Sequence, residues 1–262
     1  MIPEYAINEW RNTVLWGGLE QIELDLVICR ALTELYNDDY LASHLAFRGG
    51  TALHKLYLSP QPRYSEDIDL VQINAEPVRE TIKRISRALS FIGNPVVKQK
   101  ANNNTLVFRF ESEIQPVVPL KLKVEINCRE HFNILGLTKI RFQVHNQWFT
   151  GECQTTTYMI DELLGTKLRA LYQRRKGRDL YDLYKALSVA DVNADNVILC
   201  YNEYMKHGPG KPPSRKEFQR NVELKMQDDD FLSDMNMLLR VGERYDPQQA
   251  YEVVKAMLLG RL

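Results

Sequence analysis

The chain has 262 residues, and 44% of them are hydrophobic, which is enough to bury one large core or two smaller ones. Its 34 Lys and Arg residues balance its 34 Asp and Glu residues, so no overall positive field would gather polyanions. This balance argues against a protein that coats nucleic acid, but it is compatible with an enzyme that binds one nucleic-acid end through a local patch.

The cysteines and the N-terminal residues indicate the compartment. The four cysteines are widely scattered and contain no CxxC pair, so we expect reduced thiols. The N-terminal sequence MIPEYAINEWRNTVLW has neither the basic nor the apolar region of a leader, and no apolar run approaches the roughly 18 residues of a membrane span. We therefore expect a soluble cytoplasmic protein with no membrane partner.

The first part of the chain mixes helical and strand patterns. Apolar residues spaced by three and four predict a helix over 9–40 that ends at Asn37–Asp39. A brief apolar run, 45–47, is followed by a short helix that ends at Tyr57. Alternation then predicts a strand over 64–73, and a helix is expected over 76–92. Three further strands are expected at Thr105–Glu111, Leu120–Asn127 and Lys139–Val144.

From Asp161 onward the predicted elements are helices. Strands mixed with helices, followed by helices alone, are typical of an α+β protein with two packed units. We therefore expect an α+β domain over residues 1–150 and a helical domain over residues 151–262.

The sequence SEDIDL places two carboxylates on one face of the predicted strand over 64–73. The strand period puts Asp67 and Asp69 roughly 7 Å apart. They repel one another unless cations lie between or beside them, and this geometry suits Mg²⁺, which prefers oxygen ligands and shares substrate phosphates. Glu125 of KVEIN is the best candidate for a third carboxylate from a neighbouring strand. The alternative is a solvated face without a metal.

Two adjacent glycines precede this strand. Gly49 and Gly50 open the short helix that continues with Thr51. Glycine lets a backbone approach a phosphate closely, and the free N–H groups of a helix N-terminus bind anions. A glycine pair alone is usually just a turn, but together with the two carboxylates it predicts a site for phosphate and metal.

The segment DELLGTKLRALYQRRKGRDLYDLYKAL, residues 161–187, combines a leucine stripe with many cations. Gly177 is a candidate break, so its basic residues share one face only if the helix is continuous. One interpretation is a solvated, salt-bridged helix; the other is a cationic patch that faces a triphosphate, with an aspartate of RDLYD orienting a basic neighbour or acting directly. The residues in question are Lys167, Arg174, Arg178, Asp179 and Asp182.

Four motifs occur in order over residues 45–187: FRGGTALHK, RYSEDIDL, KVEINCRE and KLRALYQRRKGRDLYDLY. Together they resemble the AbiEii/AbiGii toxin family, nucleotidyltransferase-like proteins of the DNA polymerase β superfamily. The resemblance implies a small mixed β-sheet with flanking helices, followed by a helical bundle, with the active cleft between them. It also implies a toxin of a bacterial toxin–antitoxin or phage-defence pair, with an AbiEi-like antitoxin, and some members of the family add nucleotides to tRNA 3′ ends.

The same resemblance implies roles for individual residues. Gly49, Gly50 and Thr51 match the phosphate-contacting loop, and Lys55 matches the lysine that ends this motif. The metal-binding pair, for Mg²⁺ or Mn²⁺, is matched by Asp67 and Asp69, while Glu125 stands where the wider superfamily has a third acidic residue. The later motifs are matched by Lys167 and by Asp182 or Asp179.

The expected reaction is in-line attack of a hydroxyl on the α-phosphate of a nucleoside triphosphate, with pyrophosphate as the leaving group. The expected acceptor is the tRNA 3′ end; alternatives are a protein hydroxyl, a small molecule, or a non-catalytic module that binds nucleotide or an antitoxin. A tRNA would have to bind a local basic patch, for which the candidates are Lys98, Lys100, Arg109, Arg169, Arg174, Arg175 and Lys176.

Overall fold

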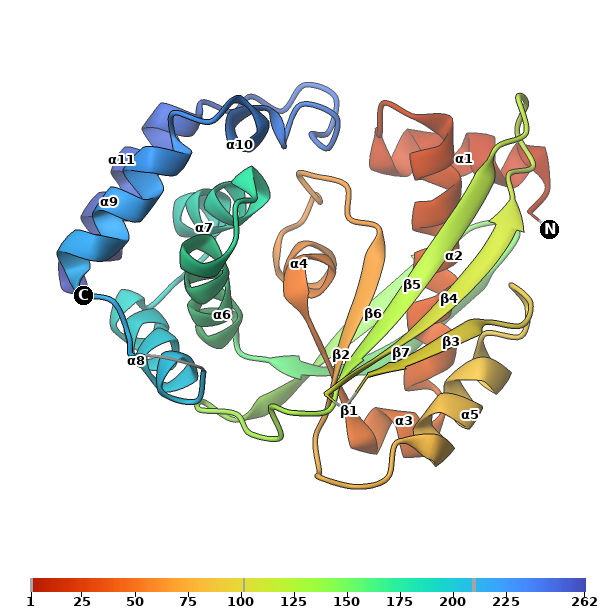
Figure 1. The fold of residues 1–262 in the computed structure, drawn as a ribbon. Helices are drawn as coiled ribbons and strands as arrows, with labels where there is room; N and C mark the ends of the chain where they lie inside the picture. Colours follow the sequence, from red (N-terminus) through yellow and green to blue (C-terminus); the bar gives the residue numbers. More distant parts are fainter. Residues whose placement is uncertain (1, 101, 209–210) are drawn as a thin grey trace. The chain divides into compact units, whose positions relative to one another are not determined.

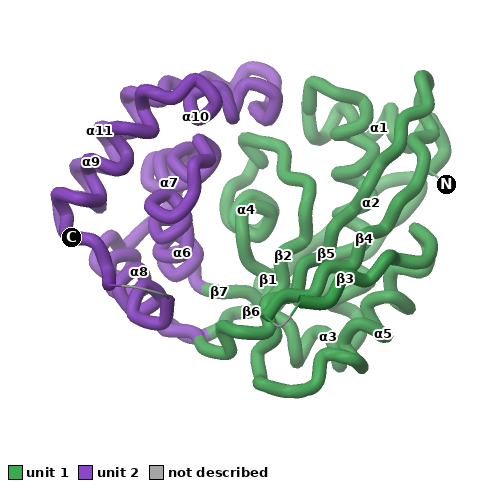
Figure 2. Tube along the Cα trace, viewed as in Figure 1, with its two compact units in different colours: residues 1–132, 137–158 green, residues 133–136, 159–262 purple. Residues whose placement is uncertain are grey.

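The computed structural model describes residues 2–100, 102–208 and 211–262, which form two compact units. Unit 1 comprises residues 1–132 and 137–158, and unit 2 comprises residues 133–136 and 159–262 (Figure 2). Unit 1 ends with strand β7 (Thr150–Tyr158), so this strand starts at the residue where we expected the first domain to end.

Three helices form where the sequence predicted one: α1 (Glu4–Val14), α2 (Leu19–Tyr36) and α3 (Asp39–His44). The prediction of a single helix over 9–40 was wrong. Leu15 adopts a left-handed backbone, with φ of 53°, which ends α1 because a right-handed helix does not continue through it. Apolar spacing continues across this break and conceals it. The predicted end of α2 is confirmed, since Asn37 follows its last residue.

Unit 1 is built on a seven-stranded mixed sheet with the order β3-β4-β5-β2-β1-β7-β6 (Figure 1). Strands β1 and β7 are parallel, as are β2 and β5, and the other neighbouring pairs are antiparallel. Besides β7, the strands are β1 (Leu45–Arg48), β2 (Asp67–Gln72), β3 (Val96–Lys100), β4 (Asn103–Glu111), β5 (Pro119–Asn127) and β6 (Leu137–His145).

The strands predicted over 64–73, 105–111, 120–127 and 139–144 are confirmed as β2, β4, β5 and β6. The sequence analysis missed β3 and β7. Every residue of β3 is exposed, so no buried face generates an alternating pattern. In β7 the buried positions include threonines, which apolar periodicity does not count.

One face of the sheet carries the core of unit 1. Helix α2 packs against β5, β6 and β7, and α1 and α5 (Arg79–Ala88) pack against α2. Ile68 of β2 and Val124 of β5 are fully buried on the core face. The alternate residues of these strands point to the other face, on which Asp67 and Glu125 lie. Between β1 and β2 the chain forms α4 (Gly49–Ala52) and a π-helical turn (Leu53–Tyr57).

Unit 2 is helical, as expected. Leu164, Leu168 and Leu171 are fully buried, and α6 packs against α7, α8 and α9. Helix α7 in turn contacts α10 and α11. The helices are α6 (Ile160–Gln173), α7 (Gly177–Val189), α8 (Ala194–Lys206), α9 (Arg215–Lys225), α10 (Asp229–Ser233), α11 (Pro247–Met257) and a 3₁₀ turn at Leu259–Arg261.

The chain is therefore an α+β protein with a mixed sheet, as the sequence predicted. All four cysteines are free thiols. Within the described parts of the chain, every helix is too short or too polar to cross a bilayer.

Candidate active site

Strand pairing gathers three carboxylates on the exposed face of the sheet. In the parallel pair β2–β5, Asp69 lies directly opposite Glu125 and Asp67 lies opposite Lys123. On the other side of β2, Arg48 of β1 lies opposite Asp69. Because residues opposite one another share a face, these side chains form one polar group at the centre of the sheet.

The glycine pair begins α4 directly beside this group. Gly49 has a φ of +81°, a backbone conformation that favours glycine. A Cβ atom at this position would lie 2.2 Å from Oδ2 of Asp69, so the carboxylate occupies the space that any other side chain would need. The close approach of the helix start to Asp69 therefore requires glycine.

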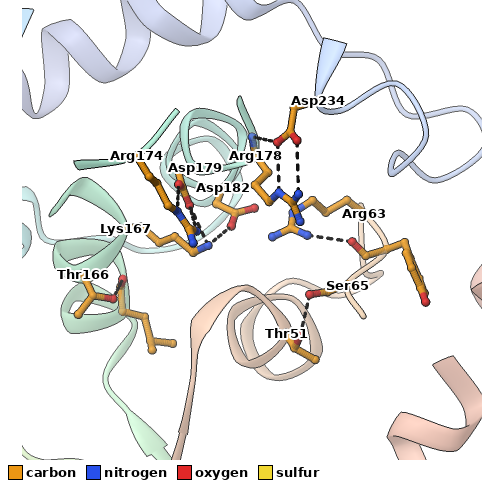
Figure 3. A network of polar contacts seen from close by, with 12 residues as sticks. Thr51, Arg63, Ser65, Thr166, Lys167, Arg174, Arg178, Asp179, Asp182 and Asp234 are labelled. Atoms are coloured by element: carbon orange, nitrogen blue, oxygen red, sulfur yellow. Dashed lines mark hydrogen bonds and ion pairs between the residues drawn. The ribbon is translucent and has the colours of Figure 1, made fainter. Parts of the chain in front are cut away.

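Thr51 connects α4 to the strand that carries the carboxylates. Its hydroxyl lies 2.6 Å from Oγ of Ser65 (Figure 3). The same hydroxyl donates to the backbone carbonyl of Asp67 at 2.5 Å. Thr51 is buried, and Ser65 is partly buried. The hydroxyl of Thr51 thus fixes the helix start against the first residue of β2.

The carboxylates outnumber the cations beside them. Burial raises the pKa of Asp67 to about 6; the Lys123 ammonium opposes this shift, and the neighbouring carboxylates Glu66, Asp69 and Glu125 add to it. Lys123 Nζ lies 3.6 Å from Oδ2 of Asp67. Arg48, opposite Asp69, is the second cation of the group and also pairs with Glu130. Three carboxylates beside these two cations are electrostatically suited to a divalent cation.

The donor set fits a metal that the protein shares with a substrate. Among the described residues, no group of three or more acidic, His or Cys side chains is arranged to hold an ion. If an ion binds at this group, Asp67 and Asp69 would be its protein ligands, and phosphate oxygens and water would complete the shell. This division is typical of Mg²⁺, which keeps several waters and is held by one or two carboxylates.

The structure places Lys55 in the core, although the resemblance implied contact with a nucleotide. Its ammonium lies 2.8 Å from Oδ1 of Asp25 and 3.3 Å from Sγ of Cys29, and its side chain is only 4% exposed. Trp10 donates to the second oxygen of Asp25 at 3.0 Å, and Lys55 also donates to Gln61 at 3.3 Å. The ion pair thus joins α1, α2 and the turn that follows α4.

Arg48, Lys123 and Ser65 belong to this site, although the sequence analysis did not assign them to it. Arg48 is the last residue of β1, directly before Gly49, and pairs with Glu130 at 2.5 Å. Lys123 shares the alternation of KLKVEIN with Glu125, and this alternation was the available signal. The partners of Arg48 and Ser65 follow from strand register and loop packing, which leave no pattern in the sequence.

A buried charge cluster in unit 2 contains the second set of candidate residues. Lys167 Nζ lies 2.7 Å from Oδ2 of Asp182 and 3.2 Å from Oδ1 of Asp179 (Figure 3). Both carboxylates are fully buried, and the lysine side chain is 7% exposed. Arg174 donates to both oxygens of Asp179, at 2.6 and 2.7 Å. Burial alone would raise the pKa of Asp179, but Lys167 and Arg174 outweigh burial and hold it below its usual value.

Arg178 is bound elsewhere in unit 2. Its backbone N–H and its guanidinium donate to Oδ2 of Asp234, at 3.0 and 3.1 Å (Figure 3). The segment between α6 and α7 is extended at Arg174, and α7 begins at Gly177, where a Cβ atom would lie 2.0 Å from the carbonyl oxygen of Phe231. The break expected at Gly177 is present, and its glycine allows close packing of α7 against α10.

Comparison with known proteins decides the family. The model of the nucleotidyl transferase AbiEii toxin family, of the type IV toxin–antitoxin systems, matches residues 30–253. The chain belongs to the AbiEii family. It is therefore a nucleotidyltransferase toxin, with a nucleoside triphosphate as substrate and an antitoxin as partner. No curated protein matches the chain in sequence.

Solved structures share the fold of this AbiEii toxin. MenT4, the nucleotidyltransferase toxin Rv2826c from Mycobacterium tuberculosis H37Rv, is similar with a TM-score of 0.71 at 17% identity, over 98% of this chain and 90% of that one. JHP933 from Helicobacter pylori is similar with a TM-score of 0.52 at 16% identity, over 98% of this chain and 91% of that one. The shared fold covers both units.

Proposed function

We propose that this AbiEii toxin transfers a nucleotide from a nucleoside triphosphate to the 3′ hydroxyl of tRNA, with Mg²⁺ or Mn²⁺ as its ion. We place this activity in the cytoplasm, in a system that protects against phage and in which an AbiEi-like antitoxin restrains the toxin. The observation that carries the proposal is the contact of Gly49 with Asp69: a helix start suited to phosphate lies against a carboxylate pair suited to metal.

The residues of unit 1 bind and orient the triphosphate. The N–H groups of Gly49, Gly50 and Thr51 donate to the β- and γ-phosphates, because the first N–H groups of a helix have no partner within it. Asp67 and Asp69 would hold the divalent ion, which would stabilise negative charge on the attacking and leaving oxygens.

Glu125 accepts the proton of the attacking hydroxyl in this proposal. It lies opposite Asp69 and is only partly buried, so an acceptor can reach it. Asp182, the other candidate for this role, is fully buried against Lys167 and serves to orient that lysine. Removal of the proton raises the nucleophilicity of the hydroxyl at the moment of attack.

The residues of unit 2 supply positive charge. Lys167 compensates for negative charge as it develops on the transferred phosphate. Arg174 contacts the nucleotide, while Asp179 positions Lys167 and Arg174 through the contacts described above.

The acceptor is tested by following a labelled nucleotide. Purified toxin is incubated with Mg²⁺, each α-³²P-labelled nucleoside triphosphate in turn, total tRNA and total cell protein. We expect label on tRNA, and no label on tRNA whose 3′ diol has been destroyed by periodate. Label on protein alone would contradict the tRNA acceptor and favour nucleotidylation of a protein. Nucleotide binding without transfer to any acceptor would contradict the catalytic assignment.

A further inference from the structure

The sheet face that carries the carboxylates continues across β5, β4 and β3 as a basic surface. Residues directly opposite in neighbouring strands share a face. The register places Thr105 opposite both Glu125 and Lys98, so the row that contains Asp69 and Glu125 ends at Lys98 on the edge strand. With strands about 4.8 Å apart, this row extends roughly 14 Å from Asp69.

Neighbouring rows of the same face carry further cations. Arg109 lies directly opposite Lys121, and Lys100 lies opposite Asn103. Lys123, opposite Asp67, joins these cations to the carboxylates. Glu111, at the end of β4, is the acidic residue that β3–β5 carry on this face in addition to the carboxylates of the site. The basic face is defined here as Lys98, Lys100, Arg109, Lys121 and Lys123.

The charges of the basic face are not explained by contacts within the protein. Lys98, Lys100, Arg109 and Lys121 are exposed, and none of them forms an ion pair with a residue in the described parts of the chain. Arg109 and Lys121 are like charges placed directly opposite, an arrangement that destabilises a sheet. A polyanion bound across β3–β5 would remove this repulsion.

We infer that the basic face binds the phosphate backbone of the RNA acceptor and thereby delivers its 3′ end to Asp67 and Asp69. The inference rests on the proposed tRNA acceptor and specifies where that acceptor lies on unit 1. Phosphates neutralise the unpaired lysines and arginine and release counterions, which gives affinity without sequence recognition. An extended polyanion matches a surface that runs in rows across three strands, whereas a triphosphate is too short to reach from Asp69 to Lys98.

The test is charge reversal on the basic face, with a matched control. The variant Lys98→Glu/Arg109→Glu removes two cations of the face, and it relieves the repulsion between Arg109 and Lys121, so it should not unfold the protein. The control Lys83→Glu/Arg87→Glu makes the same change of net charge at exposed positions of α5, a helix that packs against α2 and α3. Both are assayed with total tRNA, Mg²⁺ and the nucleotide that wild type transfers.

We expect the basic-face variant to raise the KM for tRNA at least about tenfold, while the KM for the nucleotide stays at the wild-type value. The logarithm of the association constant for tRNA falls linearly with the logarithm of the salt concentration. The slope of this line should become less negative by roughly 1.5 in the variant, because two phosphate contacts are lost. The control should match wild type in all three quantities.

The outcomes separate the two proposals. If wild type labels tRNA and the basic-face variant keeps its KM and salt dependence, the basic face does not bind the acceptor, and the proposed function stands. If the control loses as much affinity as the variant, net charge rather than this face is responsible, and the inference is wrong. If wild type labels only protein, the proposed acceptor fails and the inference fails with it.

Discussion

At Gly49 the backbone and the carboxylate of Asp69 compete for the same space. A methyl group there would lie 2.2 Å from Oδ2 of Asp69, and the φ of +81° adds backbone strain of about 1–2 kcal/mol for any other residue. We expect Gly49→Ala to reduce nucleotide transfer at least about 100-fold, because the helix start must move away from the carboxylate pair.

Gly17→Ala is the matched control for this change, since nothing lies within 4 Å of a Cβ atom at Gly17. It should leave both the transfer rate and the free energy of unfolding close to wild type. Transfer by Gly49→Ala at the wild-type rate would show that the contact between Gly49 and Asp69 is unimportant for the reaction.

The buried pair of Lys55 and Asp25 predicts a stability effect. Lys55→Met leaves Asp25 as an uncompensated buried charge, which should lower the free energy of unfolding by about 3–5 kcal/mol. The double variant Lys55→Met/Asp25→Leu removes both charges and should regain most of this loss in urea denaturation.

The double variant also distinguishes the two roles of Lys55. If the lysine is structural, the folded double variant has a KM for the nucleotide close to that of wild type. A stable double variant whose KM rises tenfold or more would instead support the nucleotide contact that the family resemblance implies.

At the scale of the elements, Asp179 holds α7 to the end of α6 through Lys167 and Arg174. Because these cations lower its pKa in the folded state, the carboxylate contributes stability above its unfolded pKa of about 3.9, and this contribution is lost as the pH falls through its folded value. We expect Asp179→Asn to cost about 3 kcal/mol of unfolding free energy at pH 7.

The difference between wild type and Asp179→Asn should narrow below about pH 4, because the unfolded wild-type chain then binds a proton at this carboxyl group while the folded state still keeps it ionised. Urea denaturation at pH 7, 5, 4 and 3.5 measures this difference. The exposed Asp191→Asn variant is the control and should follow wild type throughout. A difference that stays constant to pH 3.5 would show that the charge of Asp179 does not stabilise the joint.

The elements predicted from the sequence are those with a strong local pattern. The alternation of KLKVEIN identified β5 and placed Lys123 and Glu125 on one face, and the leucines of α6 identified its buried side. Strand β3 was missed because it buries no side chain. Asp69 and Glu125 lie far apart in the sequence and are brought together by the parallel pairing of β2 with β5. This register depends on the whole sheet, so it could not be predicted from the sequence of either strand.

At the scale of the whole molecule, net charge conceals how charge is distributed. The formal charge is zero, yet the residues opposite one another on β3, β4 and β5 gather five cations on the face that carries the carboxylates. The sequence analysis proposed Lys98, Lys100 and Arg109 as part of a basic patch. The pairing of the strands, which places these residues on the same face as Asp67, could not be predicted from the sequence. The family match spans residues of both units, so both are expected in an active toxin.

The rate of pyrophosphate release by an Asp67→Asn variant tests most directly whether the carboxylate pair drives nucleotide transfer. With Mg²⁺, nucleotide and tRNA, we expect this rate to fall at least about 100-fold below wild type, while thermal unfolding shows a folded protein. The exposed Asp39→Asn variant serves as the control and should keep the wild-type rate. Pyrophosphate release by Asp67→Asn at the wild-type rate would contradict the assignment of Asp67 to the catalytic centre.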